Sequence, residues 1–273
     1  QTRIREARLA HGMLFSGPAG TGKTAFASHF ARSLLCTQPS ADGLGCGRCA
    51  ACLLMQAGTH PDFLQVSPPE DQTQILIDQV RELCRSLSLK SHAGGYKVAI
   101  LSPAEKMNTA AANSLLKTLE EPTDNTVLVL ITEQPTRLPA TIRSRCQQLR
   151  FPVPMLAQGK AWLEAQAMSA DEAELLLRLA DGAPLRAVGL GQSGILKERR
   201  TWLEQLIAMR RGQLDPVRTA AEWAEDAEVR PLYWFGSLLS DLARLSQGDS
   251  SSIKNIDLLD KLQTLAAVLT PPE

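Results

Sequence analysis

The amino-acid sequence predicts an α/β fold, in which a parallel sheet carries helices on both faces, followed by an all-helical region. Three observations predict it. Short β-like runs alternate with segments of helical periodicity as far as Phe151, which is typical of strands joined by crossover helices. A glycine-rich loop, Gly17–Thr24, stands directly after a predicted strand and before a predicted helix. Beyond Pro152-Val153-Pro154 only helical periodicity remains.

The elements of the first region follow from local patterns. Residues 74–89 are expected to form an amphipathic helix, because apolar side chains recur at helical spacing at Ile75, Val80, Leu83 and Leu87. Pro122 ends the Ala- and Leu-rich helix before it. The predicted strands are Gly12–Ser16, Phe63–Val66, Lys97–Leu101, Val127–Thr132 and Gln147–Phe151. The predicted helices are Ala25–Leu35, 74–89 and Thr109–Glu120.

Changes of pattern divide the chain into three predicted domains. Residues 1–152 form the sheet domain, 153–192 a small helical domain, and 193–273 a second helical domain. The two helical domains are separated because helical periodicity breaks at Gly189–Gly194. The ending Thr270–Glu273 lacks a helix-stop pattern, so we expect the last domain to be incomplete.

Charge and composition exclude several classes of protein. Lys+Arg and Asp+Glu both number 29 among 273 residues, so bulk charge does not indicate a strongly basic nucleic-acid binder, although a local basic face stays open. The hydrophobic fraction of 44% is that of an ordinary globular protein, and no apolar run approaches the length of a membrane span. Six cysteines, four of them clustered, argue against a secreted disulfide framework. We therefore expect a cytoplasmic protein.

The glycine-rich loop has the pattern of a complete phosphate-binding motif. Its glycines let backbone amides turn inward around phosphate oxygens, and the following helix N-terminus adds a favourable dipole. Lys23 is expected to reach the β- and γ-phosphates, and Thr24 to place its hydroxyl on magnesium. The alternative is a loop that is retained but unused. The predicted nucleotide-binding residues of the loop are Gly17, Pro18, Ala19, Gly20, Thr21, Gly22, Lys23 and Thr24.

The acidic partner of such a loop is missing from the sequence. A phosphate-loop ATPase has an Asp at the end of a neighbouring strand to hold magnesium. The best candidate strand, Lys97–Leu101, is followed by Ser102 and Pro103, which supply no carboxylate. Glu105 lies further along, and we expect it to point in a different direction. The alternative is that another strand carries the acid. We expect a chain that can bind ATP without hydrolysing it and that does not hold Mg²⁺ firmly.

Four cysteines form a dense cluster with the spacing Cys36-x9-Cys46-x2-Cys49-x2-Cys52. Four thiolates at this spacing suit a tetrahedral, structural Zn²⁺ that folds a small module over residues 36–52. Free surface thiols and an iron–sulfur centre are the alternatives. Cys84 and Cys146 are expected to be buried and inert.

These motifs occur together in one family. The phosphate loop, a four-cysteine insert between the first helix and the second strand, and two terminal helical regions resemble bacterial DNA polymerase III clamp-loader subunits, of the delta-prime and gamma/tau kind. The resemblance covers at least residues 9–190 and rests also on Thr59-His60-Pro61-Asp62, Ala110–Pro122 and Ser144-Arg145-Cys146. It implies an AAA+ sheet domain with a zinc-binding insert, a helical lid, and a helical collar domain that joins neighbouring subunits.

Within that family the missing acid favours the delta-prime kind. Gamma/tau subunits carry an Asp-Glu pair after the third strand, where this sequence has Ser102-Pro103. The resemblance implies that Arg145 is an arginine finger, which reaches into the ATP site of an adjacent gamma/tau subunit. A surface salt bridge is the alternative for Arg145. Thr132 matches the position that senses the γ-phosphate, and Arg186 matches a second phosphate-sensing arginine.

The resemblance also implies a function and partners. The chain is expected to be a non-hydrolysing subunit of the DNA polymerase III holoenzyme that helps to load the sliding clamp onto primed DNA during replication. Its partners are then the gamma/tau and delta subunits and, through the assembled ring, the clamp and DNA; no membrane is involved. Two other functions stay open: an active gamma/tau-like ATPase, and a zinc-dependent nucleic-acid-binding module.

Overall fold

The computed structural model describes residues 9–225, 230–250 and 252–269. The chain divides into two compact units, Gln1–Pro152 and Val153–Glu273. Thr270–Glu273, on which the expectation of an incomplete last domain rests, lie outside the described residues. The further division of the helical half at residue 193 stays a prediction.

The first unit is built on a parallel sheet of five strands in the order β2-β3-β4-β1-β5. The strands are β1 (Gly12–Ser16), β2 (Phe63–Val66), β3 (Lys97–Leu101), β4 (Thr126–Thr132) and β5 (Gln147–Arg150). The helices are α2 (Lys23–Leu35), α3 (Ala50–Gln56), α4 (Ile77–Ser88), α5 (Thr109–Glu120) and α6 (Ala140–Arg143), with 3-10 turns η1 (Ala104–Lys106) and η2 (Pro135–Arg137). The predicted fold class, a parallel α/β sheet followed by helices alone, is confirmed.

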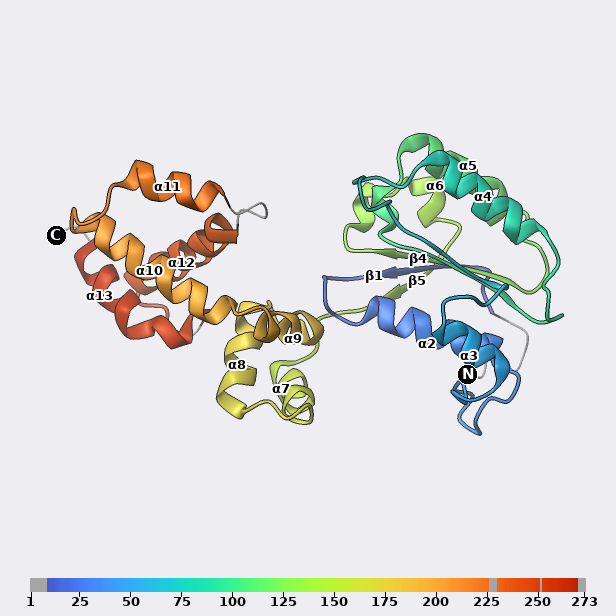
Figure 1. Cartoon of the computed structure of the whole chain (residues 1–273), viewed down its shortest axis with the longest axis horizontal. Coiled ribbons are helices and arrows are strands. Elements are labelled where there is room, and N and C mark those ends of the chain that lie inside the picture. Colours follow the sequence, from blue (N-terminus) through green and yellow to red (C-terminus); the bar gives the residue numbers. More distant parts are fainter. Residues whose placement is uncertain (1–8, 226–229, 251, 270–273) are drawn as a thin grey trace. The chain divides into compact units, whose positions relative to one another are not determined.

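Helices cover both faces of the sheet, with α2 and α3 on one face and α4, α5 and α6 on the other (Figure 1). Successive side chains of a strand point to opposite faces, and β1 follows this rule. Leu14 joins the core beneath α4 and α5, whereas Met13 and Phe15 join the core against α2. Burying one such side chain contributes about 1.5–3 kcal/mol to folding. Two hydrophobic cores therefore hold β1 from both faces of the sheet.

Several details of this unit differ from the sequence prediction. Helix α2 begins two residues earlier, at Lys23, β4 begins one residue earlier, β5 ends one residue earlier, and the short helix α6 was not predicted. Helix α4 begins at Ile77, three residues later than expected, because Ile75 pairs instead with Met107 as an isolated β-bridge and its N–H donates to Lys106 O (2.9 Å). The short helix α3 lies within the cysteine region, where no helix was predicted.

Two buried charged groups, Lys97 and Asp62, form hydrogen bonds at the end of the sheet where β2 and β3 begin. The ammonium of Lys97, at the start of β3, donates to the carbonyls of Ser86, Leu89 and Lys90 at the end of α4, at 2.8–3.3 Å. A cation is favourable there because carbonyls at a helix C-terminus carry partial negative charge. Asp62, fully buried, accepts hydrogen bonds from the amides of His92 (2.8 Å) and Ala93 (3.0 Å).

The second unit is helical throughout its described residues. Its elements are α7 (Leu156–Glu164), α8 (Ala170–Leu179), α9 (Pro184–Gln192), α10 (Ile195–Arg210), α11 (Pro216–Ala224), α12 (Arg230–Ser246), η3 (Ile256–Leu258) and α13 (Leu259–Leu269). One core lies among α7, α8 and α9, and another among α10, α12 and α13. A third cluster, with Leu179, Ile195 and Trp234 buried at its centre, joins the two.

A buried arginine links the C-terminal helices. Arg199 of α10 is fully buried and donates to Asn255 Oδ1 (2.5 Å) and Asp257 Oδ1 (3.0 Å). Its guanidinium lies 5.4 Å from the ring centroid of Trp234 on α12. A buried cation is tolerated only with such partners. Among the described residues, no helix combines the length and apolar character needed to cross a membrane.

Asp62 is expected to make folding stability depend on pH. Burial alone would raise the pKa of its carboxyl group, but the amides of His92 and Ala93 and the charge of Lys97 together hold that pKa below its ordinary value. Its stabilisation is therefore complete above about pH 4 and is lost as pH falls through the lower, folded-state pKa. Asp62→Asn should lower the unfolding free energy at neutral pH by about 1–3 kcal/mol.

Urea unfolding of both proteins from about pH 7 to about pH 2 measures this effect. The difference between wild type and Asp62→Asn should shrink on acidification, and a constant difference would contradict the account. Asp78→Asn is the matched control, because that side chain is 85% exposed.

Candidate functional site

The phosphate loop connects the carboxyl end of β1 to α2, and glycines allow its path. A Cβ atom on Gly17 would lie 2.2 Å from the carbonyl oxygen of Phe151, so no larger residue fits there. Gly20 and Gly22 adopt positive φ angles of 74° and 91°, which side chains other than glycine rarely adopt. Thr21 Oγ1 donates to Pro18 O at 2.9 Å and closes the turn.

Lys23 is the first residue of α2 and is almost completely buried. Its ammonium donates to the carbonyls of Gly17 (2.8 Å) and Pro18 (2.6 Å), so the loop curves around it. Burial lowers the pKa of this ammonium, whereas the nearby carboxylates of Glu133 and Glu105 act to raise it. A buried cation within a turn of backbone is an arrangement suited to phosphate oxygens.

Thr132 lies beside the start of the loop. It ends β4, pairs in register with Ser16, and its carbonyl accepts a hydrogen bond from Gly17 N (3.3 Å). Its side-chain oxygen accepts from Gln134 N (3.1 Å). An open pocket of about 710 Å³ borders Gly17–Ala19 and Glu133–Thr136. The loop, Lys23 and Thr132 thus meet at the carboxyl edge of the sheet, where nucleotides bind in α/β proteins.

The strand expected to end in the acidic partner is β3, and Ser102-Pro103 do follow it. The structure adds two facts that sequence reasoning did not supply. First, β4 rather than β3 is the direct neighbour of β1. Second, Glu105 in η1 accepts a hydrogen bond through Oε1 from Glu133 N (3.1 Å), just beyond the end of β4. Two carboxylates therefore lie near Lys23.

Arg145 lies at the opposite end of the strands from the loop, beside the amino end of β1. A Cβ atom on Gly12, the first residue of β1, would lie 3.4 Å from the carbonyl oxygen of Arg145. The loop begins at the other end of β1, about 16 Å away at about 3.3 Å per residue. The guanidinium pairs with Glu120 Oε1 (2.6 Å) and donates to Thr141 O (2.9 Å), and the side chain is 36% exposed.

Arg186, in α9 of the second unit, is engaged by its own unit. Its guanidinium forms an ion pair with Asp181 (3.3 Å) and donates to the hydroxyl of Tyr233 on α12 (2.6 Å). It also lies over the Tyr233 ring, 5.7 Å from the centroid. These contacts join α9 to α12. The predicted phosphate-sensing role of Arg186 stays a prediction.

The four clustered cysteines meet in space, with their sulfur atoms all within 4.8 Å of one another. Cys36 follows α2 and Cys49 caps the N-terminus of α3, so the two helices bring distant parts of the insert together. Sγ of Cys36 and Sγ of Cys49 are 3.8 Å apart, far longer than a disulfide bond. Four sulfurs around one Zn²⁺ at about 2.3 Å are separated by about 3.8 Å. The group can therefore bind a metal ion such as zinc.

Backbone amides favour the thiolate forms of Cys46 and Cys49 by lowering the pKa of both thiols, whereas burial raises the pKa of the Cys52 thiol to about 12. The amides of Cys46, Cys49 and Cys52 donate in turn to the sulfurs of Cys36, Cys46 and Cys49, at 3.3–3.5 Å. The hydrogen bond from the Cys52 amide is the largest cause that lowers the pKa of the Cys49 thiol to about 5. Thiolates are the form of cysteine that ligates metals. Cys84 is half-buried and Cys146 buried, and burial raises the pKa of both thiols.

Comparison with known proteins identifies the family. Residues 1–155 match the family described as "DNA polymerase III, delta subunit", and residues 193–272 match "DNA polymerase III, delta subunit, C terminal". The DNA polymerase III subunit delta-prime of Escherichia coli is 35% identical over 262 residues, which are 96% of this chain and 78% of the relative. The chain belongs to the delta-prime family of DNA polymerase III subunits. The resemblance expected from the sequence is confirmed.

Two further relatives and one solved structure are also similar to this chain. The delta-prime subunit of Pseudomonas aeruginosa is 44% identical over 220 residues, 80% of this chain, and the match spans 66% of that relative's length. Subunit tau of Bacillus subtilis is 31% identical over 196 residues, covering 70% of this chain and 34% of tau. A solved gamma-subunit-related structure from Thermotoga maritima has a TM-score of 0.44 at 20% identity, covering 97% of this chain and 77% of that chain.

Metal analysis of the purified protein is expected to find about one zinc per chain, since the four sulfurs form one complete ligand set. Cys52→Ser should lose most of this zinc and lower the melting temperature, because a structural zinc contributes directly to folding. Cys84→Ser, outside the cluster, should keep both. A folded wild-type protein with far less than one equivalent of zinc would contradict the assignment.

Proposed function

We propose that this chain is the non-hydrolysing delta-prime subunit of a DNA polymerase III clamp loader, in which Arg145 serves the ATP site of a neighbouring subunit. The observation that carries the proposal is the separation of Arg145 from the chain's own phosphate loop. The two lie at opposite ends of β1, with Gly12 beside Arg145 and Gly17 opening the loop. An arginine so placed cannot reach phosphates held by its own loop. Its side chain is 36% exposed, and we propose that it acts on those of an adjoining subunit.

The chemistry of such an arginine is established for phosphoryl transfer. A guanidinium supplied from a neighbour stabilises charge on the transferring phosphoryl group, and its planar donors suit phosphate oxygens. In this chain the guanidinium is held by Glu120 and by Thr141 O. This ion pair is exposed and therefore worth little energy, about 1 kcal/mol or less. A phosphate group can displace Glu120 at small cost.

The residues of the chain's own loop and of the end of strand β3 favour binding of ATP without its hydrolysis. Lys23, Thr24 and the loop amides provide the groups that hold phosphates. Ser102 and Pro103, directly after β3, provide neither a magnesium-binding carboxylate nor a base for water. Thr132 adjoins the loop at the position proposed to sense the γ-phosphate. We infer that any bound ATP acts as a structural ligand.

The remaining parts of the chain fit a subunit that keeps its shape within a ring. Zinc held by Cys36, Cys46, Cys49 and Cys52 is proposed to be structural, since sulfur fills all four positions. Residues 153–192 are proposed to form the lid and 193–273 the collar domain, the latter packing against the gamma/tau and delta subunits. The sliding clamp and primed DNA are then partners of the assembled loader, and the neutral chain has no bulk charge for DNA binding by itself.

Arg145→Ala should leave loader assembly intact and lower DNA-stimulated ATP turnover of the complex reconstituted with gamma/tau and delta. The site that Arg145 serves should lose about 10³-fold or more in rate, so the complex retains at most the share of its other sites. Steady-state phosphate release by the complex measures the effect.

Two variants separate this role from a surface salt bridge. Glu120→Ala breaks the same ion pair but keeps the guanidinium, so turnover should be retained. Arg85→Ala removes an exposed arginine that is likewise paired with a glutamate, and it should have no effect on turnover. Equal losses for Arg145→Ala and Glu120→Ala would argue for the salt bridge and against the finger.

A further inference from the structure

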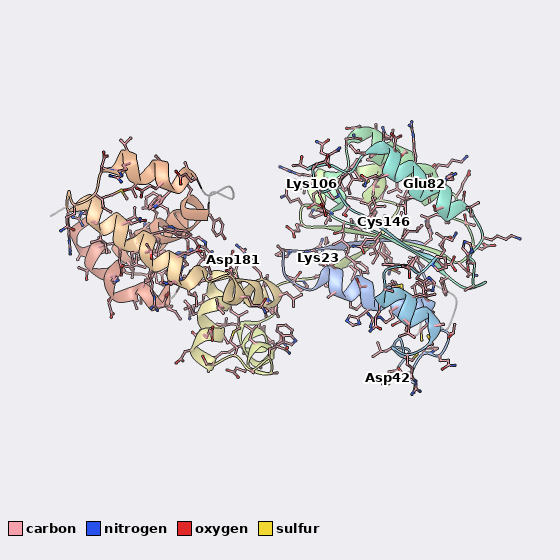
Figure 2. All side chains as sticks on the ribbon, viewed as in Figure 1. Lys23, Asp42, Glu82, Lys106, Cys146 and Asp181 are labelled. Atoms are coloured by element: carbon pink, nitrogen blue, oxygen red, sulfur yellow. The ribbon has the colours of Figure 1, made fainter. Side chains whose placement is uncertain are left out.

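The carboxylate of Glu105 is connected to the phosphate loop through hydrogen bonds to intervening backbone groups. Strand β3 ends at Leu101, and after Ser102-Pro103 the chain forms the single turn η1, in which Ala104 is fully buried. Glu105 follows Ala104 in this turn and binds Glu133 N through Oε1 (3.1 Å). The turn thus extends from the end of β3 to the end of β4. Figure 2 shows Lys106, the next residue of η1, at the same end of the sheet as Lys23.

The backbone next to Glu105 is in turn joined to the loop. Glu133 directly follows Thr132, whose carbonyl accepts from Gly17 N at 3.3 Å. The carbonyl of Gly17 accepts from the ammonium of Lys23 at 2.8 Å. Three hydrogen bonds, linked through the Thr132–Glu133 peptide and through Gly17, therefore connect the Glu105 carboxylate with the ammonium that the loop surrounds. Burial lowers the pKa of that ammonium, and the charges of Glu133 and Glu105 act in the opposite direction.

One oxygen of Glu105 has no partner. Oε2 is buried and accepts no hydrogen bond from the described residues, while Oε1 is satisfied by Glu133 N. A carboxylate oxygen that is removed from water without a donor is unfavourable, and a cation or a donor is what satisfies it. An oxygen of this kind beside a phosphate loop suits Mg²⁺, which is bound through one or two carboxylates together with phosphate oxygens.

We propose that Glu105 supplies the carboxylate missing from the end of β3, and that the loop binds a nucleoside triphosphate together with a divalent cation held by Glu105 and Thr24. This rests on the proposal that Gly17–Thr24 is a nucleotide site. Thr24 is exposed at the start of α2, with its hydroxyl unpaired among the described residues. The inference concerns binding alone, since Ser102 and Pro103 still provide no base for water.

The charges near the loop give this inference a measurable consequence. Glu105 and Glu133 both lie close enough to act on Lys23, so without a cation they repel the phosphates of a bound nucleotide. A divalent cation between Glu105 and the phosphates replaces this repulsion with coordination. Nucleotide affinity should therefore depend strongly on the cation, and Glu105 should be responsible for that dependence.

Titration calorimetry of the full chain with ATP, in MgCl₂ and in EDTA, tests the proposal. Wild type should bind ATP at least about tenfold more tightly with Mg²⁺ than with EDTA. Glu105→Gln should lose most of this enhancement while its affinity in EDTA stays equal or improves, because a repulsive charge has gone. Glu105→Asp keeps the charge but shortens the side chain, and should fall between the two. Spectra of bound Mn²⁺ should change in Glu105→Gln, which reports the ligand directly.

The control is Glu121→Gln, which makes the same change of charge at the end of α5, where the chain turns to enter β4 at the opposite edge of the sheet. It should keep the full enhancement. Equal affinity of wild type in Mg²⁺ and EDTA, a full enhancement in Glu105→Gln, or unaltered binding by Lys23→Ala would each overturn the proposal. Failure of ATP to bind at all would also overturn it, but would leave the role of Arg145 in the reconstituted loader untouched.

Discussion

The direction of β1 is the constraint on which the rest of the first unit depends. Parallel strands β4 and β5 bind it from both sides, so its two ends are held at opposite edges of the sheet. The carboxyl end continues into the phosphate loop, and the amino end lies against Arg145. Because the register is maintained by two hydrophobic cores, the loop and the arginine cannot approach each other. This arrangement is the basis of our proposal that the chain holds one nucleotide at the carboxyl end of β1 and acts on another from the amino end.

In each unit a buried cation donates hydrogen bonds that connect two separate elements. Lys97 joins the start of β3 to the end of α4, and Arg199 joins α10 to the segment before α13. Each is almost fully buried, and each would be costly without its acceptors.

Local patterns could be predicted from the sequence and non-local ones could not. The loop Gly17–Thr24 and the spacing of Cys36, Cys46, Cys49 and Cys52 are contiguous motifs, and their residues do meet in space. Helix α3 was missed because a segment of seven residues carries too little periodicity to detect. The partnership of Glu105 with Glu133 depends on β3 and β4 being neighbours, which no local pattern states. The same is true of Arg186 and Tyr233, which are 47 residues apart.

The central claim is that this chain carries a phosphate loop but does not turn over ATP by itself. Its direct test is steady-state ATP hydrolysis by the purified full chain beside Lys23→Ala, with ATP binding measured on the same preparations. The account predicts that wild type releases phosphate no faster than Lys23→Ala, because no carboxylate directly follows β3 to activate water. Clear turnover by wild type that Lys23→Ala abolishes would contradict it, and would make the chain an active gamma/tau-like ATPase.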